Sequence, residues 1–345
     1  MGITNTEYFL LFVISYFCVG VLTPVMRRIA IATDLVDRPN SSHKSHKNPV
    51  PYLGGVAIII GVITVSYSAS LFSEFTSSTF WLVTSVLGPA LLLGLIGLWD
   101  DIRNLPPLPR FIAQNFAGIF TACILIVTDN IGNPTGSTIF DSIITVVWIV
   151  GICNSINFFD NLDGGAAGTV AISSIALAYL ALSGDQYLIA ALSTVTAGAT
   201  LGFLVWNKSP AKIYMGDAGA LFLGVLLAAL TVRFEPSTQS QLSSYTIPVF
   251  FIAIPILDTT VAVVSRLKRN LSPFQGGQDH LSHRLIRAGY ARRSAAISLW
   301  GLSALFAAIA VLVSQTEGLI KNYILLFASM LWLTLFGLFF KTRDS

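Results

Sequence analysis

Long apolar blocks separated by short polar stretches follow one another along almost the whole chain. The blocks are close to the roughly 20 residues that a helix needs to cross a bilayer, and they contain almost no charged residues. This pattern predicts an all-α, polytopic integral membrane protein with about 11 transmembrane helices, folded as one domain over residues 1–345. We expect the spans at residues 8–25, 53–72, 81–98, 111–127, 140–156, 166–183, 187–206, 219–232, 247–264, 294–313 and 323–340.

Composition agrees with a membrane protein and excludes other classes. Of the 345 residues, 54% are hydrophobic and 11% are charged, whereas about a quarter of the residues in ordinary soluble domains are charged. The 3 cysteines are too few and too scattered for a disulfide scaffold or a thiolate metal site. The net charge of +3 is small, and we expect no nucleic-acid partner.

The basic residues gather on one side of the predicted bundle. When the spans are followed from the amino terminus, all of the 20 Lys and Arg residues except Arg233 and Lys321 fall on one side. Cytoplasmic loops of membrane proteins carry such an excess, so we expect the N-terminus outside and the C-terminus in the cytoplasm. All 4 histidines also fall on the cytoplasmic side, which predicts that any chemistry takes place there.

Two adjacent carboxylates, Asp100 and Asp101, end the third predicted span. Neighbouring side chains on a helix point about 100° apart, so the two cannot address one atom from the same face. We expect a division of roles, with one carboxylate near a cation and the other near a proton or a basic partner. A solvated helix end is the simpler alternative.

Amide and acid side chains spaced by three close the fifth predicted span, at Asn154, Asn157, Asp160 and Asp163, before a pair of glycines. A spacing of three drifts by about 60° per step on an α-helix, so the two aspartates stay aligned only if the chain tightens or leaves the helix. Four oxygen-bearing side chains suit a hard cation and the edge of a ribose or a base. An elaborate helix cap would give the same pattern.

A polar segment after the seventh span contains Asn207, Tyr214 and Asp217. Asp217 lies among glycines where a new apolar run begins. At such a helix start the carboxylate can reach a metal, while free backbone N–H groups favour anions. Tyr214 offers a stacking face and Asn207 an amide for a nucleobase, although a capped turn alone would look the same.

His280, His283, Arg284 and Arg287 recur at helical spacing in a later cytoplasmic segment, with apolar residues on another side. The pattern predicts an amphipathic surface helix with a cationic stripe. Such a stripe can bind a pyrophosphate or rest on anionic lipid headgroups. We favour the phosphate, because arginine alone would satisfy lipid and the histidines would be unnecessary.

A second histidine pair, His43 and His46, lies in a basic segment without helical patterning. Together with the pair at 280 and 283 it offers four ligands of the kind that bind zinc. The neighbouring cations Lys44 and Lys47 would weaken a metal site, so anion binding is the better interpretation.

Asp258 lies inside the ninth predicted span, three residues after Pro255. A charge there is costly and is expected to face the protein interior, either as a proton or ligand site or as part of a hydrogen-bonded helix kink. A transporter would need intramembrane charge, and Asp258 is the one clear case in a chain without evident inverted halves. We therefore favour an enzyme over a transporter.

Taken together and in this order, the motifs resemble those of the polyprenyl-phosphate N-acetylhexosamine-1-phosphate transferases, the glycosyltransferase family 4 type. The Pro-Tyr-Leu-Gly-Gly run at 51–55 and the Ser-Pro-Phe run at 272–274 add to the match, which is best for the bacterial undecaprenyl-phosphate N-acetylglucosamine 1-phosphate transferases. The resemblance implies transfer of N-acetylhexosamine 1-phosphate from a UDP-sugar to a polyprenyl phosphate, with release of UMP. It implies a first membrane step of cell-envelope glycan synthesis, in the bacterial cytoplasmic (inner) membrane with the active site facing the cytoplasm.

The resemblance also implies roles for individual residues. Asp217 and Asn157 would bind Mg²⁺, or Mn²⁺ in its place. Asp100, Asp101 and His280 would be catalytic, with one of the two aspartates as the base for the lipid phosphate. The substrate-binding residues would be Asn154, Asn157, Asp160, Asp163, Asn207, Tyr214, His283 and Arg284, of which Asp163, Asn207 and Tyr214 would hold the uridine. The expected partners are the UDP-sugar, the lipid phosphate and the membrane, and a homodimer is compatible with the sequence.

The sequence departs from the family at two positions. Ser282 stands where a further histidine is common, and Arg110 stands where a lysine is expected. Arginine keeps the charge but not the compact, titratable ammonium. For the reaction we favour direct attack by the lipid phosphate over a covalent aspartyl intermediate, because a phosphate oxyanion is already a competent nucleophile.

Overall fold

The computed structural model describes residues 4–37, 49–72, 77–103, 106–127, 135–236, 241–272 and 277–342. Within these ranges the chain forms α-helices joined by short connections and a single pair of short antiparallel strands. In chain order the elements are α1 (Asn5–Ala32), β1 (Val36–Asp37), β2 (Val50–Pro51), α2 (Gly54–Phe72), α3 (Ser77–Arg103), α4 (Pro107–Val127), α5 (Thr138–Phe159), α6 (Gly165–Ser183), α7 (Tyr187–Asn207), α8 (Gly216–Arg233), α9 (Gln241–Phe251), α10 (Ala253–Lys268), α11 (Leu281–Arg287), α12 (Arg292–Gln315) and α13 (Gly318–Lys341).

The predicted all-α polytopic membrane architecture is confirmed. In the described part of the chain, 9 helices are long and apolar enough to cross a membrane, namely α1, α2, α3, α5, α6, α7, α8, α12 and α13. The fourth predicted span corresponds to a shorter apolar helix, Phe111–Val127. Every predicted span therefore has a helical counterpart. The number of helices that cross the bilayer stays a prediction, and so does the side of the membrane on which each end of the chain lies.

The ninth predicted span corresponds to two helices, α9 and α10, which meet at an angle of 78°. Pro255 has no N–H group to donate to the carbonyl of Phe251, four residues earlier. That carbonyl instead accepts a hydrogen bond from the Ser173 hydroxyl at 2.5 Å. The proline therefore ends the helical hydrogen-bond ladder where the pair bends.

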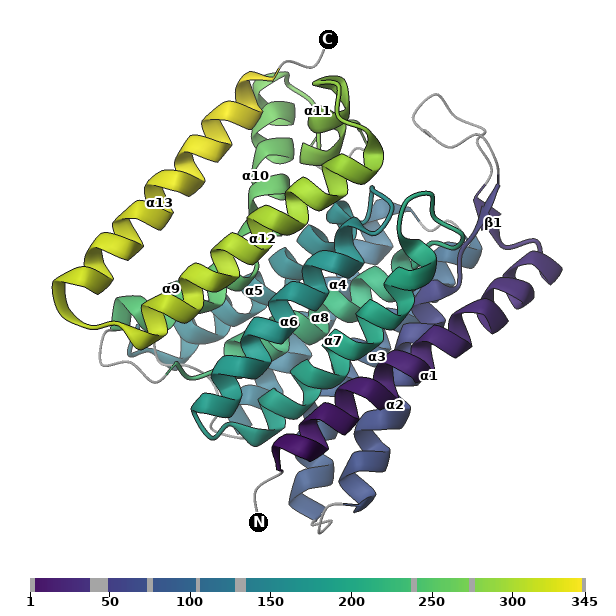
Figure 1. Cartoon of the computed structure of the whole chain (residues 1–345), viewed down its shortest axis with the longest axis horizontal. Coiled ribbons are helices and arrows are strands. Elements are labelled where there is room, and N and C mark those ends of the chain that lie inside the picture. Colours follow the sequence, from purple (N-terminus) through teal and green to yellow (C-terminus); the bar gives the residue numbers. More distant parts are fainter. Residues whose placement is uncertain are drawn as a thin grey trace.

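Helix α8 lies at the centre of the bundle, packed against α3 and α5, and α13 lies at its edge beside α10 and α12 (Figure 1). Of the apolar windows of these helices, 83% of α8 is buried inside the protein but only 11% of α13. Large apolar side chains such as Phe17 on α1 and Leu319 on α13 are more than half exposed. These outer faces are suited to contact with lipid chains rather than water.

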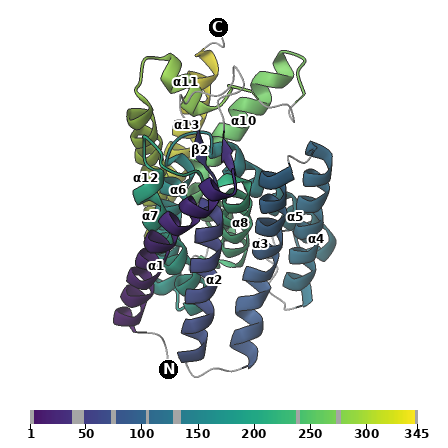
Figure 2. The same ribbon diagram turned by 90° about the vertical axis from the view of Figure 1, so that its right-hand side faces the viewer.

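The two ends of the chain lie at opposite ends of the bundle, with the start of α1 at one end and the close of α13 at the other (Figures 1 and 2). Helix α11 and the strands β1 and β2 lie at the end where α13 closes (Figure 2). The helix termini that carry the predicted motifs meet at this same end, which we call the polar end.

Candidate active site

The polar end is organised around the start of α8. One carboxylate oxygen of Asp101, at the end of α3, accepts the backbone N–H of Asp217 at 2.9 Å, and the other accepts that of Ala218 at 3.1 Å. The first N–H groups of a helix have no partner within the helix, and a carboxylate there also meets the positive end of the helix dipole. Asp101 thus caps α8 from a neighbouring helix and sets the position of Asp217.

Gly216 makes this close approach possible. Its φ is +68°, in the left-handed region that favours glycine. A Cβ atom on this residue would lie 2.5 Å from an oxygen of Asp101. A side chain at 216 would therefore strain the backbone and push the capping carboxylate away.

Asn157, near the end of α5, contacts Asp217 directly. Its side-chain amide donates to a carboxylate oxygen of Asp217 at 2.7 Å. Helix α5 ends at Phe159, so the chain leaves the helix before Asp160 and Asp163, as their alignment requires. Two residues assigned to one metal by the resemblance, from positions 60 apart in the chain, are therefore side by side.

Four carboxylates gather at the polar end, those of Asp101, Asp160, Asp163 and Asp217. Burial raises the pKa of Asp160 well above its usual value, and repulsion by the other three acids raises it further. Such a cluster creates a local negative potential that a bound cation would relieve.

Asn207 and Asp163 hold the segment that leads to α8. The Asn207 side chain accepts the N–H of Gly164 at 3.0 Å and donates to the carbonyl of Ile213 at 2.9 Å, and it is almost fully buried. Asp163 accepts the N–H of Ala211 at 3.1 Å. In this geometry both side chains position the protein chain. The Asn207 amide and the Asp163 carboxylate, which the resemblance assigns to uridine binding, form hydrogen bonds with backbone groups instead.

Tyr214 joins this segment to the glycine run at 51–55. Its N–H donates to the carbonyl of Pro51 at 2.9 Å, and its carbonyl accepts the N–H of Gly54 at 3.0 Å. Burial raises the pKa of the Tyr214 phenol and the charge of Asp163 raises it further, so the ring stays neutral. The structure thus brings the 51–55 run and the 207–217 segment of the resemblance into direct contact.

Asn154 and Asp100 lie on the flanks of the cluster. The Asn154 amide donates to Gln114 of α4 at 2.7 Å and to the carbonyl of Val150 at 2.8 Å. Asn154 therefore ties α5 to α4. Its partner in this contact, Gln114, was not singled out by the sequence analysis. Asp100, next to the capping Asp101, is buried.

Helix α11 docks on the end of α5. The ring of His280 lies 5.8 Å from that of Phe158, centroid to centroid, and 6.4 Å from that of His283. The Ser282 hydroxyl donates a short hydrogen bond to the side-chain oxygen of Asn161. His280 is therefore at the same end of the bundle as Asn157, directly beside the residue that follows it.

His283 does not carry the positive charge that the predicted cationic stripe requires. Burial lowers its pKa to about 4, and the nearby His280 and Arg287 act in the same direction. The ring is therefore neutral near pH 7. One of its nitrogens can donate a hydrogen bond and the other can accept one, but the side chain adds no positive charge to the surface.

The predicted cationic surface stripe is wrong at Arg284, which is only 1% exposed. Its guanidinium donates to the carbonyls of Asp279, Phe339 and Thr342 and to the Ser265 hydroxyl. The donors of arginine suit several acceptors at once, and the last carbonyls of α13 lack helical partners. Arg284 therefore fastens α11 to α10 and α13, and the structure does not direct it toward the carboxylate cluster.

Some predicted features lie outside the described residues. These are His43, His46, Lys44 and Lys47, and also the side chain of Arg110. The zinc and anion interpretations of the first histidine pair therefore stay predictions.

Asp258 is the residue whose role the sequence left open, and the structure pairs it with His280 at 2.7 Å. The cost of a charge in a membrane span was the signal that pointed to it. The partner was not visible in the sequence, because 22 positions separate the two residues.

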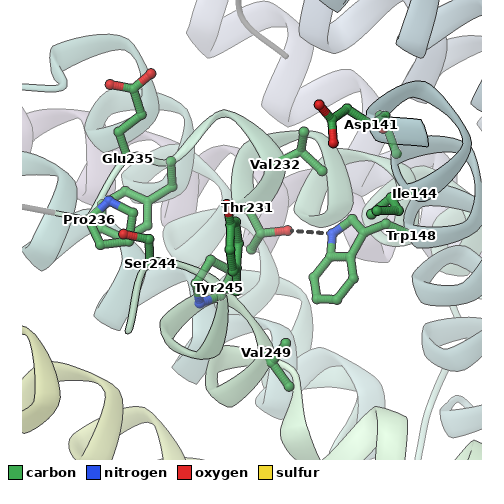
Figure 3. Close-up of a pocket in the computed structure, with 13 residues that line it drawn as sticks. Asp141, Ile144, Trp148, Thr231, Val232, Glu235, Pro236, Ser244, Tyr245 and Val249 are labelled. Carbon is green, nitrogen blue, oxygen red and sulfur yellow. Dashed lines mark hydrogen bonds between the residues drawn. The ribbon is translucent and has the colours of Figure 1, made fainter. Parts of the chain in front are cut away.

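A cavity of about 570 Å³ lies at the other ends of α5 and α8 (Figure 3). Its lining includes Asp141, Trp148, Thr231 and Tyr245, and the Trp148 indole donates to the Thr231 hydroxyl at 3.1 Å. None of the predicted site residues lines this cavity. It is therefore separate from the polar end, and the sequence analysis did not anticipate it.

The fold and the polar end together define a multi-pass membrane protein with a cluster of acid, amide and imidazole side chains at one end of its bundle. Comparison with known proteins agrees. The family described as glycosyl transferase family 4 matches residues 83–235. The chain is 33% identical to the probable undecaprenyl-phosphate N-acetylglucosaminyl 1-phosphate transferase of Bacillus subtilis (strain 168), over 95% of this chain and 87% of the relative.

Two further relatives cover similar lengths. The decaprenyl-phosphate N-acetylglucosaminephosphotransferase of Mycolicibacterium smegmatis is 33% identical over 84% of this chain and 76% of its own. The phospho-N-acetylmuramoyl-pentapeptide-transferase of Geobacillus thermodenitrificans is 29% identical over 88% and 95%. The chain therefore belongs to the polyprenyl-phosphate sugar-1-phosphate transferases of glycosyl transferase family 4.

Proposed function

We propose that this enzyme transfers N-acetylglucosamine 1-phosphate from UDP-N-acetylglucosamine to undecaprenyl phosphate or a similar polyprenyl phosphate. Membership of the family supports a sugar-phosphate transferase, and the names of the relatives at 33% identity support the sugar and the lipid. The observation that carries the proposal is the contact of Asp217 with both Asp101 and Asn157 at the end of the bundle where His280 also lies.

In the proposed reaction, an oxygen of the lipid phosphate attacks the β-phosphorus of the UDP-sugar. The bond from that phosphorus to the bridging oxygen breaks, and UMP leaves with this oxygen. Because both oxygens of Asp101 accept N–H groups of α8, Asp101 serves to position Asp217. Asp100 is then the member of the pair proposed to take a proton from the lipid phosphate.

Mg²⁺, or Mn²⁺ in its place, would be held by Asp217 and Asn157. No group of three His, Cys, Asp or Glu side chains among the described residues is arranged to hold a metal. This fits an ion that binds with its substrate, since Mg²⁺ needs only one or two carboxylates when water and phosphates complete its shell. The ion would neutralise charge on the diphosphate.

The polar end would face the cytoplasm of a bacterium from the inner membrane. The basic residues support this orientation, because nearly all of them fall at the ends of spans predicted on that side. The lipid phosphate would then approach from the cytoplasmic leaflet and the UDP-sugar from the cytosol. A homodimer remains part of the proposal, and its test is the mass of the purified particle.

The test supplies the purified protein with undecaprenyl phosphate, Mg²⁺ and a panel of UDP-sugars, and identifies the lipid product by mass. We expect UDP-N-acetylglucosamine to give the lipid-linked diphosphate sugar together with UMP. The Asp217→Asn variant should lose the activity, while Asp185→Asn, an exposed acid between α6 and α7, should keep it. Absence of both transfer and UMP exchange with every sugar would refute the proposal, and a sugar-phosphorylated aspartate after rapid quench would refute direct attack.

A further inference from the structure

Asp258 is a fully buried carboxylate on α10. One of its oxygens lies 2.7 Å from Nδ1 of His280, and the other accepts the backbone N–H of Leu281 at 2.7 Å. The carboxylate therefore holds both the ring of His280 and the first residue of α11. A buried charge persists only where its partners compensate the loss of water, and these two contacts use both oxygens.

Two neighbouring arginines, one on α10 and one at its C-cap, bind a different carboxylate. Arg266 donates to Asp279 at 2.7 Å, and Arg269 makes a second, short contact with the same carboxylate. Asp279 precedes His280 in the chain, so these ion pairs fasten the segment before the ring to α10. Asp258 is left to act on the imidazole itself.

The contact determines which nitrogen of His280 is free. An ionised carboxylate only accepts hydrogen bonds, so Nδ1 carries the proton and donates it to Asp258. The other nitrogen, Nε2, is then the one that can meet a ligand at the polar end. Packing against Phe158 at 5.8 Å fixes the ring from the side of α5.

We propose that Asp258 is a positioning residue, which keeps the proton of His280 on Nδ1 and presents Nε2 to the diphosphate or sugar of the donor. The inference rests on the proposed function for what Nε2 meets, whereas the pairing rests on geometry alone. Asp258 itself touches no substrate in this proposal.

The Asp258→Asn variant separates the two effects of the carboxylate. Asparagine keeps one oxygen for the N–H of Leu281, but its amide nitrogen then faces Nδ1 of His280. Because an amide nitrogen only donates, the ring has to accept at Nδ1 and carry its proton on Nε2. We expect kcat to fall by about 10- to 100-fold, as for other partners that orient a functional histidine, with the KM for the UDP-sugar changed by less than about threefold.

The matched control is Thr259→Val, the next position on α10. The Thr259 hydroxyl donates to Ser155 at 3.0 Å and contacts neither His280 nor the carboxylate cluster through that bond. The control removes one part-buried hydrogen bond from the same helix, so kcat should stay within about twofold of the parent. An equal loss in both variants would show that α10 is merely sensitive to substitution, and would overturn the proposal.

A double-variant experiment tests whether Asp258 acts through His280. In a His280→Gln background, Asp258→Asn should lower kcat by no more than about twofold further, because two residues that act as a unit are not additive. Effects that multiply would contradict the proposed pathway, as would an unchanged kcat in Asp258→Asn alone.

A spectroscopic measurement keeps the proposal testable even if a variant folds poorly or the parent shows no transfer. The chain has only 4 histidines, so ¹⁵N-histidine labelling of the full protein in detergent gives few imidazole signals. We expect an Nδ1-protonated ring signal that the parent and Thr259→Val share and that is absent from His280→Gln and from Asp258→Asn. A parent without such a ring refutes the pairing, whereas a parent with it but without transfer refutes only the proposed function.

Discussion

Asp217 is held from two directions at the residue scale. Its backbone N–H donates to Asp101, and its side chain accepts from Asn157. The first contact stabilises the start of α8, and the second orients the Asp217 carboxylate toward a ligand. Stability and activity are therefore expected to separate between variants of the two aspartates.

We predict that Asp101→Asn destabilises the fold more than Asp217→Asn does. An asparagine at 101 has one accepting oxygen, so its amide group opposes one of the two N–H donors of α8, which costs about 1–3 kcal/mol. An asparagine at 217 keeps an oxygen for the Asn157 amide. Thermal unfolding in detergent should show a lowered midpoint for the first variant only, with transfer lost in both; equal midpoints would contradict the capping role.

His283 gives a prediction for pH. Its pKa is about 4 in the folded protein but near 6.5 in an unfolded chain, so between these values the unfolded state binds more protons. Stability should therefore be full above about pH 6.5 and fall as the pH drops toward 4. Unfolding midpoints between pH 7.5 and 4.5 measure this, and His283→Gln should flatten the curve within that window. A slope unchanged by the substitution would assign the dependence to other groups.

At the scale of the element, α2 and α3 both approach the start of α8 closely. A Cβ atom on Gly55 of α2 would lie 2.1 Å from the backbone nitrogen of Gly219, and one on Gly97 of α3 would lie 2.4 Å from the carbonyl oxygen of Asp217. Helices with small residues at their contact can bring their backbones together. The close packing places the Asp101 cap and the 51–55 segment within reach of α8.

We expect Gly216→Ala to lower the unfolding midpoint and the transfer activity together. The left-handed backbone costs alanine about 1–2 kcal/mol, and the added methyl group meets the Asp101 carboxylate. Gly301→Ala, on α12 with nothing within 4 Å of the added carbon, is the control and should be neutral or slightly stabilising. A Gly216→Ala protein as active as the parent would show that the cap tolerates displacement.

Elements also show how far local sequence signals extend. The apolar blocks predicted the helices well, because the period and length of such blocks follow from the bilayer itself. The bend between α9 and α10 was anticipated only as an alternative, a helix kink near Pro255, since a proline in a span is often tolerated. The partner of the orphaned Phe251 carbonyl, Ser173, lies 78 positions away.

At the scale of the whole molecule, the arrangement places every predicted cytoplasmic motif within the described residues at one end of the bundle. The exposed Asp185, between α6 and α7, lies at the opposite ends of these helices from Gly164 and Asn207. Orientation in the membrane can therefore be read from reagents that reach one end only.

We predict opposite labelling of Asp185→Cys and Arg293→Cys, both at exposed positions. In right-side-out vesicles an impermeant maleimide should label the first and spare the second, and in inside-out vesicles the reverse. Serine would replace Cys18 and Cys123 in the background, while the buried Cys153 can stay. Labelling of Arg293→Cys from outside would reverse the proposed orientation of the active site.

The sequence alone determined the class of fold and the residue types of the site. Apolar blocks of membrane length, the one-sided basic residues and the spaced Asp and Asn motifs are local properties, and the physics of the bilayer and of phosphate chemistry acts on them locally. Only the tertiary structure decided which side chains serve each other. Asp101 caps α8, Arg284 binds the carbonyl groups at the end of α13, and Asp258 holds His280. A buried polar group pairs with the partner that packing places beside it, however distant that partner is in the chain.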